Sequence, residues 1–370
     1  GNIVEYYHIT APATDGVFAS EEPSQETMDS VDSQWKESMD DYNVMLVTIG
    51  RSSTENGTYL PGVDGVDASQ DLNQTDPLGL SDDERDLINA AVEAKESNGG
   101  KVIVMLNNAN AMEIDEIKNN DGVDAILEVG LPGGYGFYGV ADILSGEANP
   151  SGHLTDTYAV TNANSPAAQN FGNYEWTNAD PSVNINAEEV EAEDIYTGYK
   201  YYETRYADTV LGQGNADATV GSSTGKAWNY DDEVSYPFGY GLSYTTFDWE
   251  LKDHSVEIAK DGSVSATVKV TNTGDKAGKD VVEFYYTAPY EKGGIEKSAV
   301  ELGDYAKTKL LGPGESEEVV VTVSAEDMAS YDAYDNNKNG FAGYELDEGT
   351  YTFSIRTDSH TVKNQFNIDL

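Results

Sequence analysis

Two different hydrophobic patterns divide this chain. Up to about residue 246, apolar residues gather in short, nearly continuous runs at 44–49, 101–106 and 125–129. Runs of this length are typical of strands that are buried on both faces of a sheet. Stretches with helical spacing separate them, so strands and helices alternate. This alternation predicts an α/β domain whose mostly parallel sheet is covered by helices.

After residue 247 the hydrophobic period changes to two. Residues 263–271 alternate apolar and polar side chains without a break, which predicts a strand with one buried face. Further short strands are predicted at 281–286, 319–323, 351–356 and 362–368. Turns rich in Gly, Pro and Asp separate them, as in a β-sandwich. We therefore expect an α/β domain over residues 1–246, incomplete at its N-terminus, and an all-β sandwich over 247–370.

Helix signals fill the spaces between the predicted parallel strands. Residues 24–42 carry apolar side chains three or four positions apart, and Ser24 is a suitable N-cap, so one amphipathic helix is predicted there. Ser81 and Glu84 form a capping-box pattern at the start of a second helix that extends to Ala94. Shorter helices are predicted at 111–118 and 138–144.

A polar loop follows the first buried strand. Its sequence, GRSSTENG over residues 50–57, contains one carboxylate, Glu55. In open α/β sheets the loops that leave the carboxyl ends of the strands collect functional groups. Glu55 is therefore a candidate acid or base, and the alternative is an ordinary solvated loop glutamate.

The charge balance excludes several classes of partner. The chain has 67 acidic and 21 basic residues, a formal net charge of −46. Such a charge argues against nucleic acid or anionic lipid as a partner. It fits an extracellular or cell-surface bacterial protein that handles neutral substrates, or one adapted to salt. The absence of cysteine excludes disulfides, and no membrane span or signal peptide is expected within this chain.

Two segments resemble ligand-binding motifs incompletely. Residues 335–340, DNNKNG, match the start of a calcium loop, but position 12 is Leu346 where a bidentate glutamate is needed. A polar hairpin tip is the preferred interpretation, and calcium is not expected to stabilise the chain. The glycine-rich segment 131–136 lacks the lysine of a P-loop and the spacing of a dinucleotide site. No metal and no cofactor are predicted.

Several motifs resemble those of one enzyme family in the family's own order. The segment 50–56, GRSSTEN, is similar to the Gly-Arg-x-Ser-Gly-Glu-Gly loop of glycoside hydrolase family 3, with Thr54 and Asn56 in place of glycines. Three later segments resemble further hallmarks of the family: ADILSGEANPSG at 141–152, YTGYKYY at 196–202 and YPFGYGLSYTTF at 236–247. Residues 287–297 and 326–331 are similar to a subgroup in which a fibronectin type III-like domain precedes the catalytic barrel.

The resemblance implies a function for the chain. It is expected to be the α/β-sandwich and fibronectin type III-like part of a retaining, exo-acting β-glycosidase such as a β-glucosidase, with an oligosaccharide or β-glycoside as substrate. In the family the nucleophilic aspartate lies on a TIM-type barrel, and no barrel pattern occurs here. The barrel is expected downstream or on another chain, so this chain alone should be inactive. The second hypothesis is a stand-alone, non-catalytic carbohydrate-binding or interaction module.

The resemblance also assigns roles to residues. Glu55 matches the general acid/base of the family's loop. Arg51 would anchor that loop or bind a substrate hydroxyl, and a structural salt bridge is the alternative. Glu84 and Glu113 are the fallback acid/base candidates, although the first has the position of a helix cap and the second that of a surface helix residue.

Overall fold

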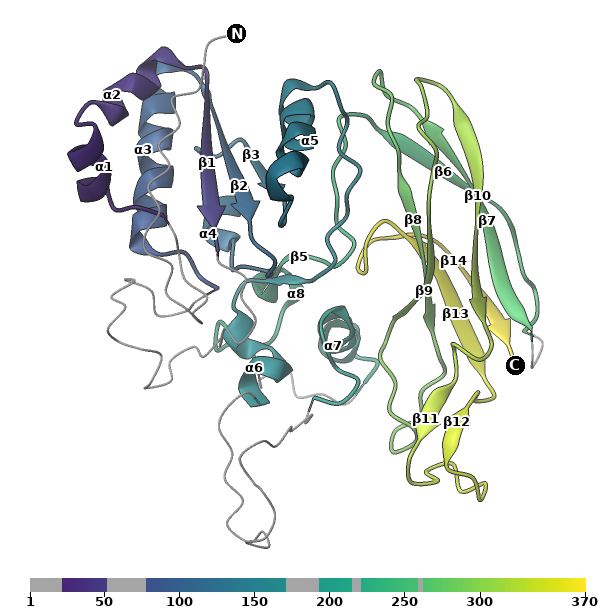
Figure 1. Ribbon diagram of the computed structural model, residues 1–370. Helices are drawn as coiled ribbons and strands as arrows, with labels where there is room; N and C mark the ends of the chain where they lie inside the picture. The colour runs from purple at the N-terminus through teal and green to yellow at the C-terminus, as the bar shows by residue number, and fades with distance from the viewer. Residues whose placement is uncertain (1–21, 52–77, 171–192, 215–220, 259–261) are drawn as a thin grey trace, which may run out of the picture. The chain divides into compact units, whose positions relative to one another are not determined.

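The structure, a computed structural model, describes residues 22–51, 78–170, 193–214, 221–258 and 262–370 (Figure 1). The chain divides into two compact units, residues 1–141 (unit 1) and 142–370 (unit 2). The domain boundary expected at residue 246 stays a prediction.

Unit 1 contains a parallel sheet in the order β1-β2-β3 (Figure 1). Its strands are β1 (Val44–Gly50), β2 (Lys101–Asn107) and β3 (Ala125–Glu128). Both pairings are parallel, with Val44 opposite Lys101 and Ile103 opposite Ala125. The described helices are α1 (Gln25–Val31), α2 (Trp35–Ser38), the 3₁₀ turn η1 (Met39–Asp41), α3 (Asp82–Asn98), α4 (Asp115–Lys118) and α5 (Gly133–Ser145), which continues into unit 2. The α/β class predicted for this region is confirmed.

Helix α3 supplies much of the buried surface of this sheet. Ala91 and Ala94 pack with Met45 of β1 and Val102 of β2. The small alanines allow the helix to approach the strands closely, so α3 has a fixed position against the sheet. Gly99 ends the helix in the left-handed conformation, at a φ of 73°, which glycine adopts without a steric cost.

The single helix predicted over residues 24–42 is wrong, because the chain breaks after Val31. Ser24 caps α1 as expected, its hydroxyl accepting from the Thr27 amide at 3.1 Å. Asp32, however, is extended, and its carboxylate accepts from the Gln34 amide at 2.9 Å. An aspartate that binds the backbone two residues ahead stabilises a turn in place of another helical turn. Helical spacing continues through the break and therefore conceals it.

Unit 2 contains the predicted β-sandwich, and both of its sheets are antiparallel (Figure 1). One sheet has the order β10-β7-β6 and the other β14-β13-β8-β9. The strands are β6 (Phe247–His254), β7 (Ser263–Asn272), β8 (Val281–Thr287), β9 (Glu301–Lys307), β10 (Ser316–Ser324), β13 (Thr350–Arg356) and β14 (Val362–Asp369). Strands β6 and β9 were not predicted. The sequence of β9, ELGDYAK, contains few apolar residues from which a strand could be predicted.

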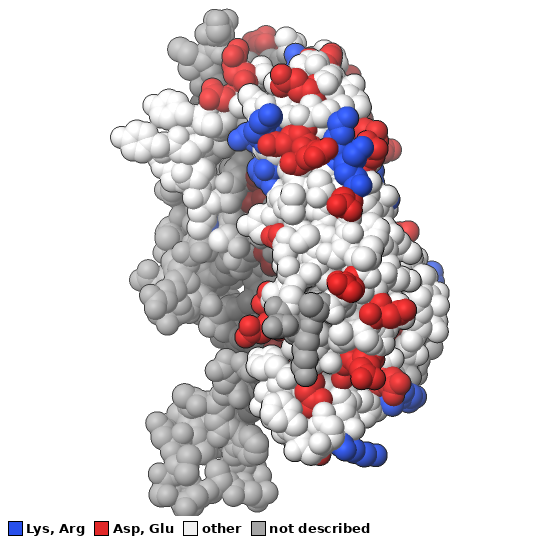
Figure 2. All heavy atoms as spheres, turned by 90° about the vertical axis from the view of Figure 1, so that its right-hand side faces the viewer, with Lys and Arg blue, Asp and Glu red and all other residues white. Residues whose placement is uncertain are grey.

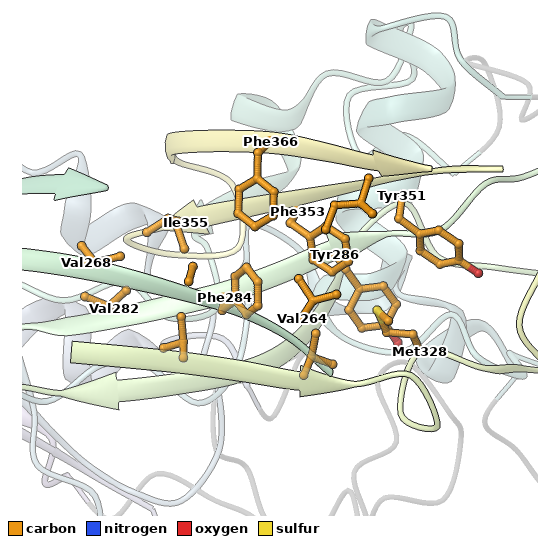
Figure 3. Close-up of a cluster of buried hydrophobic side chains, with 14 of the residues drawn as sticks. Val264, Val268, Val282, Phe284, Tyr286, Met328, Tyr351, Phe353, Ile355 and Phe366 are labelled. Atoms are coloured by element: carbon orange, nitrogen blue, oxygen red, sulfur yellow. The ribbon is translucent and has the colours of Figure 1, made fainter. Parts of the chain in front are cut away.

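The core of the sandwich is one continuous apolar cluster (Figure 3). Phe353 of β13 stacks near Phe284 of β8 and Phe366 of β14, with ring centroids 5.7 and 5.4 Å apart. Val264 and Val268, from the opposite sheet, are fully buried against them. Alternating side chains of both sheets thus meet in the middle, which is the physical basis of the period of two.

Smaller elements complete unit 2. They are β4 (Tyr158–Ala159) paired with β5 (Val234–Tyr236), the hairpin of β11 (Ser330–Asp332) and β12 (Gly343–Glu345), the helices α6 (Pro166–Asn170), α7 (Tyr199–Arg205) and α8 (Tyr230–Glu233), the 3₁₀ turn η2 (Asn162–Asn164) and the π-helical turn η3 (Tyr206–Val210). Residues 335–340 lie at the tip of the β11–β12 hairpin, as predicted.

The aromatic segment 236–247 packs within unit 2. The Phe238 ring lies 4.8 Å from that of Tyr199, and the Phe238 carbonyl accepts from the Ser359 amide at 2.8 Å. Gly239 has a φ of 84°, and a Cβ built on it would overlap the carboxylate of Glu283. The glycine in this motif is therefore required both by its backbone conformation and by the close approach of a buried carboxylate.

Acidic residues outnumber basic ones in the chain by 67 to 21. Figure 2 shows them in several separate groups, with fewer basic side chains near them.

Candidate active site

The candidate loop begins at the carboxyl edge of the parallel sheet. Strand β1 ends at Gly50, and the Arg51 amide still donates to the Asn107 carbonyl of β2, at 3.3 Å. Glu55 belongs to residues 52–77 and lies outside the described residues. The description resumes at Leu78, whose carbonyl accepts from the Glu113 amide at 2.8 Å. The described residues that flank this segment, Arg51 and Leu78, are thus each held within unit 1 by a backbone hydrogen bond.

The side chain of Arg51, at this edge of the sheet, is buried. It forms a bidentate ion pair with Glu84, in which Nη2 lies 2.9 Å from Oε2 and Nη1 binds Oε1. Nη2 also donates to the Gly79 carbonyl at 3.0 Å, and Nη1 to the Gly50 carbonyl at 3.1 Å. Neither side chain of the ion pair has any exposed surface. Of the roles considered for Arg51, the geometry fits the structural salt bridge.

Glu84 has two functions in the structure. Its Oε2 accepts from the Ser81 amide at 2.7 Å, while the Ser81 hydroxyl accepts from the Glu84 amide at 3.2 Å. This is the capping box predicted from the sequence. The same carboxylate neutralises the buried charge of Arg51. The sequence indicates the cap, but the ion pair joins residues 33 positions apart and no local pattern predicts it.

Glu113 lies just before α4 and not on the helix predicted over 111–118. Its backbone is close to the end of the candidate loop, through the bond to Leu78. Of the two fallback candidates, Glu84 is the helix cap that the sequence predicts and is enclosed in its ion pair, whereas Glu113 is partly buried in the connection before α4.

A second buried carboxylate lies in unit 2. Glu283 of β8 is 4% exposed and accepts from the Tyr285 hydroxyl at 2.6 Å. The nearest ring nitrogen of His153 lies 3.9 Å from its Oε1, and His153 Nδ1 also binds the Gly239 carbonyl. Burial raises the pKa of Glu283 to about 7 and lowers the pKa of His153. Desolvation by burial is the largest cause of the raised pKa of Glu283, and the hydrogen bond from Tyr285 opposes it.

Glu203 of α7 is another buried carboxylate, and its partners come from α8 and from the β13–β14 connection. It accepts from the Tyr230 hydroxyl at 2.6 Å and the Ser359 hydroxyl at 3.2 Å. His360 Nδ1 lies 3.0 Å from its other oxygen, and the His360 ring stacks on Tyr230 at 3.8 Å. These contacts attach α7, whose residues 199–202 belong to the YTGYKYY motif, to the β13–β14 connection. The group is fully hydrogen-bonded and serves packing within unit 2.

Within the ranges that the structure describes, no group of three or more His, Cys, Asp or Glu side chains is arranged to hold a metal ion. No described helix is both long and apolar enough to cross a membrane.

Comparison with protein-family models identifies both parts of the chain. Residues 8–244 match the model of the glycosyl hydrolase family 3 C-terminal domain. Residues 280–359 match the model of the fibronectin type III-like domain. The two matches follow the order expected from the sequence motifs.

Similar proteins agree with these matches. The chain is 36% identical over 280 residues to a β-glucosidase A of Butyrivibrio fibrisolvens and 31% identical over 349 residues to a β-glucosidase of Ruminococcus albus, covering 72% and 92% of this chain. It spans only 29% and 30% of those two relatives. The structure of β-glucosidase 3B from Thermotoga neapolitana in complex with glucose matches with a TM-score of 0.66 and 31% identity, over 90% of this chain and 38% of that one. A β-glucosidase from Paenibacillus barengoltzii gives a TM-score of 0.69 and 30% identity, over 90% and 30% of the two chains.

Proposed function

Because the chain belongs to glycoside hydrolase family 3, we propose that it forms the non-barrel part of a retaining, exo-acting β-glucosidase-like enzyme. Its relatives are β-glucosidases, and it spans less than a third of the two curated ones. The proposed substrate is an oligosaccharide or β-glycoside with a terminal β-linked sugar. The proposed nucleophile is an aspartate of a TIM-type barrel outside this chain. The proposed location is the exterior or surface of a bacterial cell, supported by the acidic composition.

Glu55 is the proposed general acid/base. The single observation that carries this proposal is the position of Arg51 at the carboxyl edge of the parallel sheet, directly after β1. The GRSSTEN segment leaves the sheet at that edge, where loops of open α/β sheets carry functional groups. In a retaining mechanism the acid/base and the nucleophile stand about 5–5.5 Å apart, so the loop would have to bring Glu55 to a sugar held in the barrel.

The chemistry follows from two proton transfers. Glu55 protonates the glycosidic oxygen as it leaves, while the barrel aspartate forms the glycosyl-enzyme ester. The resulting carboxylate then takes a proton from the water that hydrolyses this ester. Sugar and apolar surface around the carboxyl group would raise its pKa towards the value that an acid catalyst needs.

The test is Glu55→Gln in the full-length protein, with aryl β-glucosides of different leaving groups. General acid catalysis contributes about 10²–10⁴-fold, so the variant should lose roughly that factor in kcat/KM on a phenyl glucoside. It should lose far less on a dinitrophenyl glucoside, whose leaving group needs no proton. Azide should restore turnover of the latter, because azide attacks the glycosyl-enzyme without a general base.

The matched control is Glu113→Gln, which changes the neighbouring fallback candidate and should leave the leaving-group dependence unchanged. Equal slowing of good and poor leaving groups by Glu55→Gln, or none, would remove Glu55 from this role. The chain alone should not hydrolyse these substrates. Turnover by the pure chain would contradict the division of the two carboxylates between chain and barrel, while sugar binding without activity in the full-length protein would favour a carbohydrate-binding module.

A further inference from the structure

The β11–β12 hairpin exposes aromatic side chains that lie outside the core cluster of the sandwich (Figure 1). Tyr331 of β11 is 59% exposed, and Tyr344 of β12 is 72% exposed. Tyr334 and Phe341, in the connection between the two strands, are 87% and 55% exposed. A single exposed aromatic residue is ordinary, but a group of them on one small element is typical of an interaction surface.

Tyr331 and Tyr344 form a pair on one face of the hairpin. They lie directly opposite each other in the antiparallel register, so both side chains project from the same face. Their ring centroids are 5.0 Å apart and the ring planes are inclined at 63°. Each ring has an apolar face and carries a hydroxyl group that can donate and accept hydrogen bonds. The tyrosine pair therefore offers both apolar contact and hydrogen bonding to one ligand.

The opposite face of the hairpin anchors it. Alternation along β11 places Asp332 on that face, where it is fully buried. Its carboxylate accepts from the amides of Tyr334 and Asn337, both at 3.1 Å. The side chain of Asn337 donates to Asp347 at 2.7 Å, and Asp347 forms an ion pair with Lys297. The tyrosine pair thus stands on a hydrogen-bonded base, which reduces the entropy that a ligand would have to remove on binding.

The charge of the hairpin restricts the ligand. Residues 330–347 contain four acidic residues and one basic residue, Lys338, in a chain with a net charge of −46. Repulsion disfavours an anionic polysaccharide, an anionic membrane and a second copy of this acidic chain. A neutral sugar has no such penalty, because its C–H groups can lie on a tyrosine ring while its hydroxyls bond to the phenol and to water.

We propose that the tyrosine pair is a surface binding site for a neutral β-linked glucan chain. The site lies within residues 280–359, which match the fibronectin type III-like domain. The choice of a β-linked sugar rests on the proposed function, whereas the site itself does not depend on the role of Glu55. Binding here would hold the protein at a polysaccharide and raise the local concentration of its chain ends.

The experiment is affinity electrophoresis of the chain in native gels that contain mixed-linkage β-glucan. The test variant carries Tyr331→Thr and Tyr344→Thr together, because threonine favours a strand but has no ring. The matched control is Tyr305→Thr, which removes a 65% exposed tyrosine from β9. We expect wild type and control to be retarded equally, and the Kd of the double variant to rise about tenfold or more.

A second measurement on wild type keeps the test decisive if the double variant does not fold. Tetranitromethane nitrates exposed tyrosines, and mass spectrometry locates the modified residues. The glucan should protect Tyr331 and Tyr344 from nitration and leave Tyr305 as reactive as it is without glucan. Equal nitration of the pair with and without glucan would contradict the proposal.

Other occupants of the pair give different results. Equal retardation by β-glucan and by the α-glucan dextran would overturn the proposed ligand, as would retardation that the double variant retains. A dimer in sedimentation that the double variant dissociates would assign the pair to a second copy of the chain. Protection from nitration by oligolysine and not by glucan would assign it to a positively charged peptide.

The outcomes also separate this inference from the proposed function. If the glucan protects the tyrosine pair but Glu55→Gln lacks the expected leaving-group dependence, the binding site stands and the acid/base assignment fails. If Glu55→Gln shows that dependence but the chain does not bind glucan, the catalytic proposal stands and the surface site is wrong.

Discussion

Glu84 in unit 1 and Glu283 in unit 2 are both buried carboxylates, but they are neutralised in different ways. Glu84 has no exposed surface and faces the guanidinium of Arg51. Glu283 faces a tyrosine hydroxyl and a histidine whose pKa is itself lowered by burial. The first site has a permanent cation, whereas the second raises the pKa of its carboxyl group to about 7. The neighbouring side chains thus decide whether burial of a carboxylate is offset by a fixed positive charge, as at Glu84, or raises its pKa, as at Glu283.

The largest loss of stability is expected from removing the positive charge of Arg51. Arg51→Ala leaves Glu84 buried with its charge uncompensated, which should lower the free energy of unfolding by about 3–5 kcal/mol. Urea denaturation, followed by hydrogen exchange of the β1–β2 amides, measures this loss. Adding Glu84→Gln to Arg51→Ala should recover part of it, because a neutral amide tolerates the buried site better than a carboxylate. A double variant that is less stable than Arg51→Ala would show that burial of the charge is not the cause.

An intermediate effect is expected from replacing the protonated carboxyl group. Glu283 has a folded pKa of about 7 against an ordinary value of 4.5, so its ionisation penalises the folded state as pH rises through that window. At about 1.4 kcal/mol per pKa unit the penalty approaches roughly 3 kcal/mol above pH 7. Glu283→Gln should therefore gain stability relative to wild type as pH rises from about 4.5 to 8.

The sign of this prediction is specific to Glu283. Burial lowers the pKa of His153, so protonation of His153 destabilises the folded state as pH falls. This pH dependence is opposite to that of Glu283, whose ionisation destabilises the folded state as pH rises. Comparing wild type with Glu283→Gln at each pH removes the histidine contribution common to both. Urea denaturation at three pH values gives the difference in unfolding free energy between wild type and Glu283→Gln. The control is Glu318→Gln, at an exposed position on β10. A difference that does not change with pH would mean that Glu283 is ionised throughout.

The smallest effect is expected where an ion pair is exposed. Arg85 and Glu116 have side chains that are 37% and 58% exposed, with nitrogen and oxygen 2.7 Å apart. Water and salt screen such a pair, so Arg85→Ala should cost only about 0–1 kcal/mol, far less than Arg51→Ala. Thermal unfolding of both variants in low and high salt measures the two losses of stability and their dependence on salt. A loss from Arg85→Ala as large as that from Arg51→Ala would show that burial does not set the difference between them.

Local patterns in the sequence determined much of the architecture. Short apolar runs indicated the parallel strands, and alternation indicated the sandwich, because each pattern records which faces of a strand are buried. The capping box at Ser81 and the hairpin around residues 335–340 were also predicted, since their hydrogen bonds join residues that are close in sequence. The family motifs supplied the proposed role of Glu55, which no feature of composition or spacing indicates by itself.

Only the tertiary structure decided how the charged residues are paired. Arg51 meets Glu84 across 33 positions, and Glu283 meets His153 and Gly239 from distant segments. The break after Val31 likewise depends on the turn at Asp32 and not on the spacing of apolar residues, which continues unchanged. Sequence periodicity reports whether a position is buried, but the partner of a buried charge is set by chain segments that folding brings together. For that reason the sequence indicated Glu84 as a helix cap, and the structure was needed to identify it as the counter-ion of Arg51.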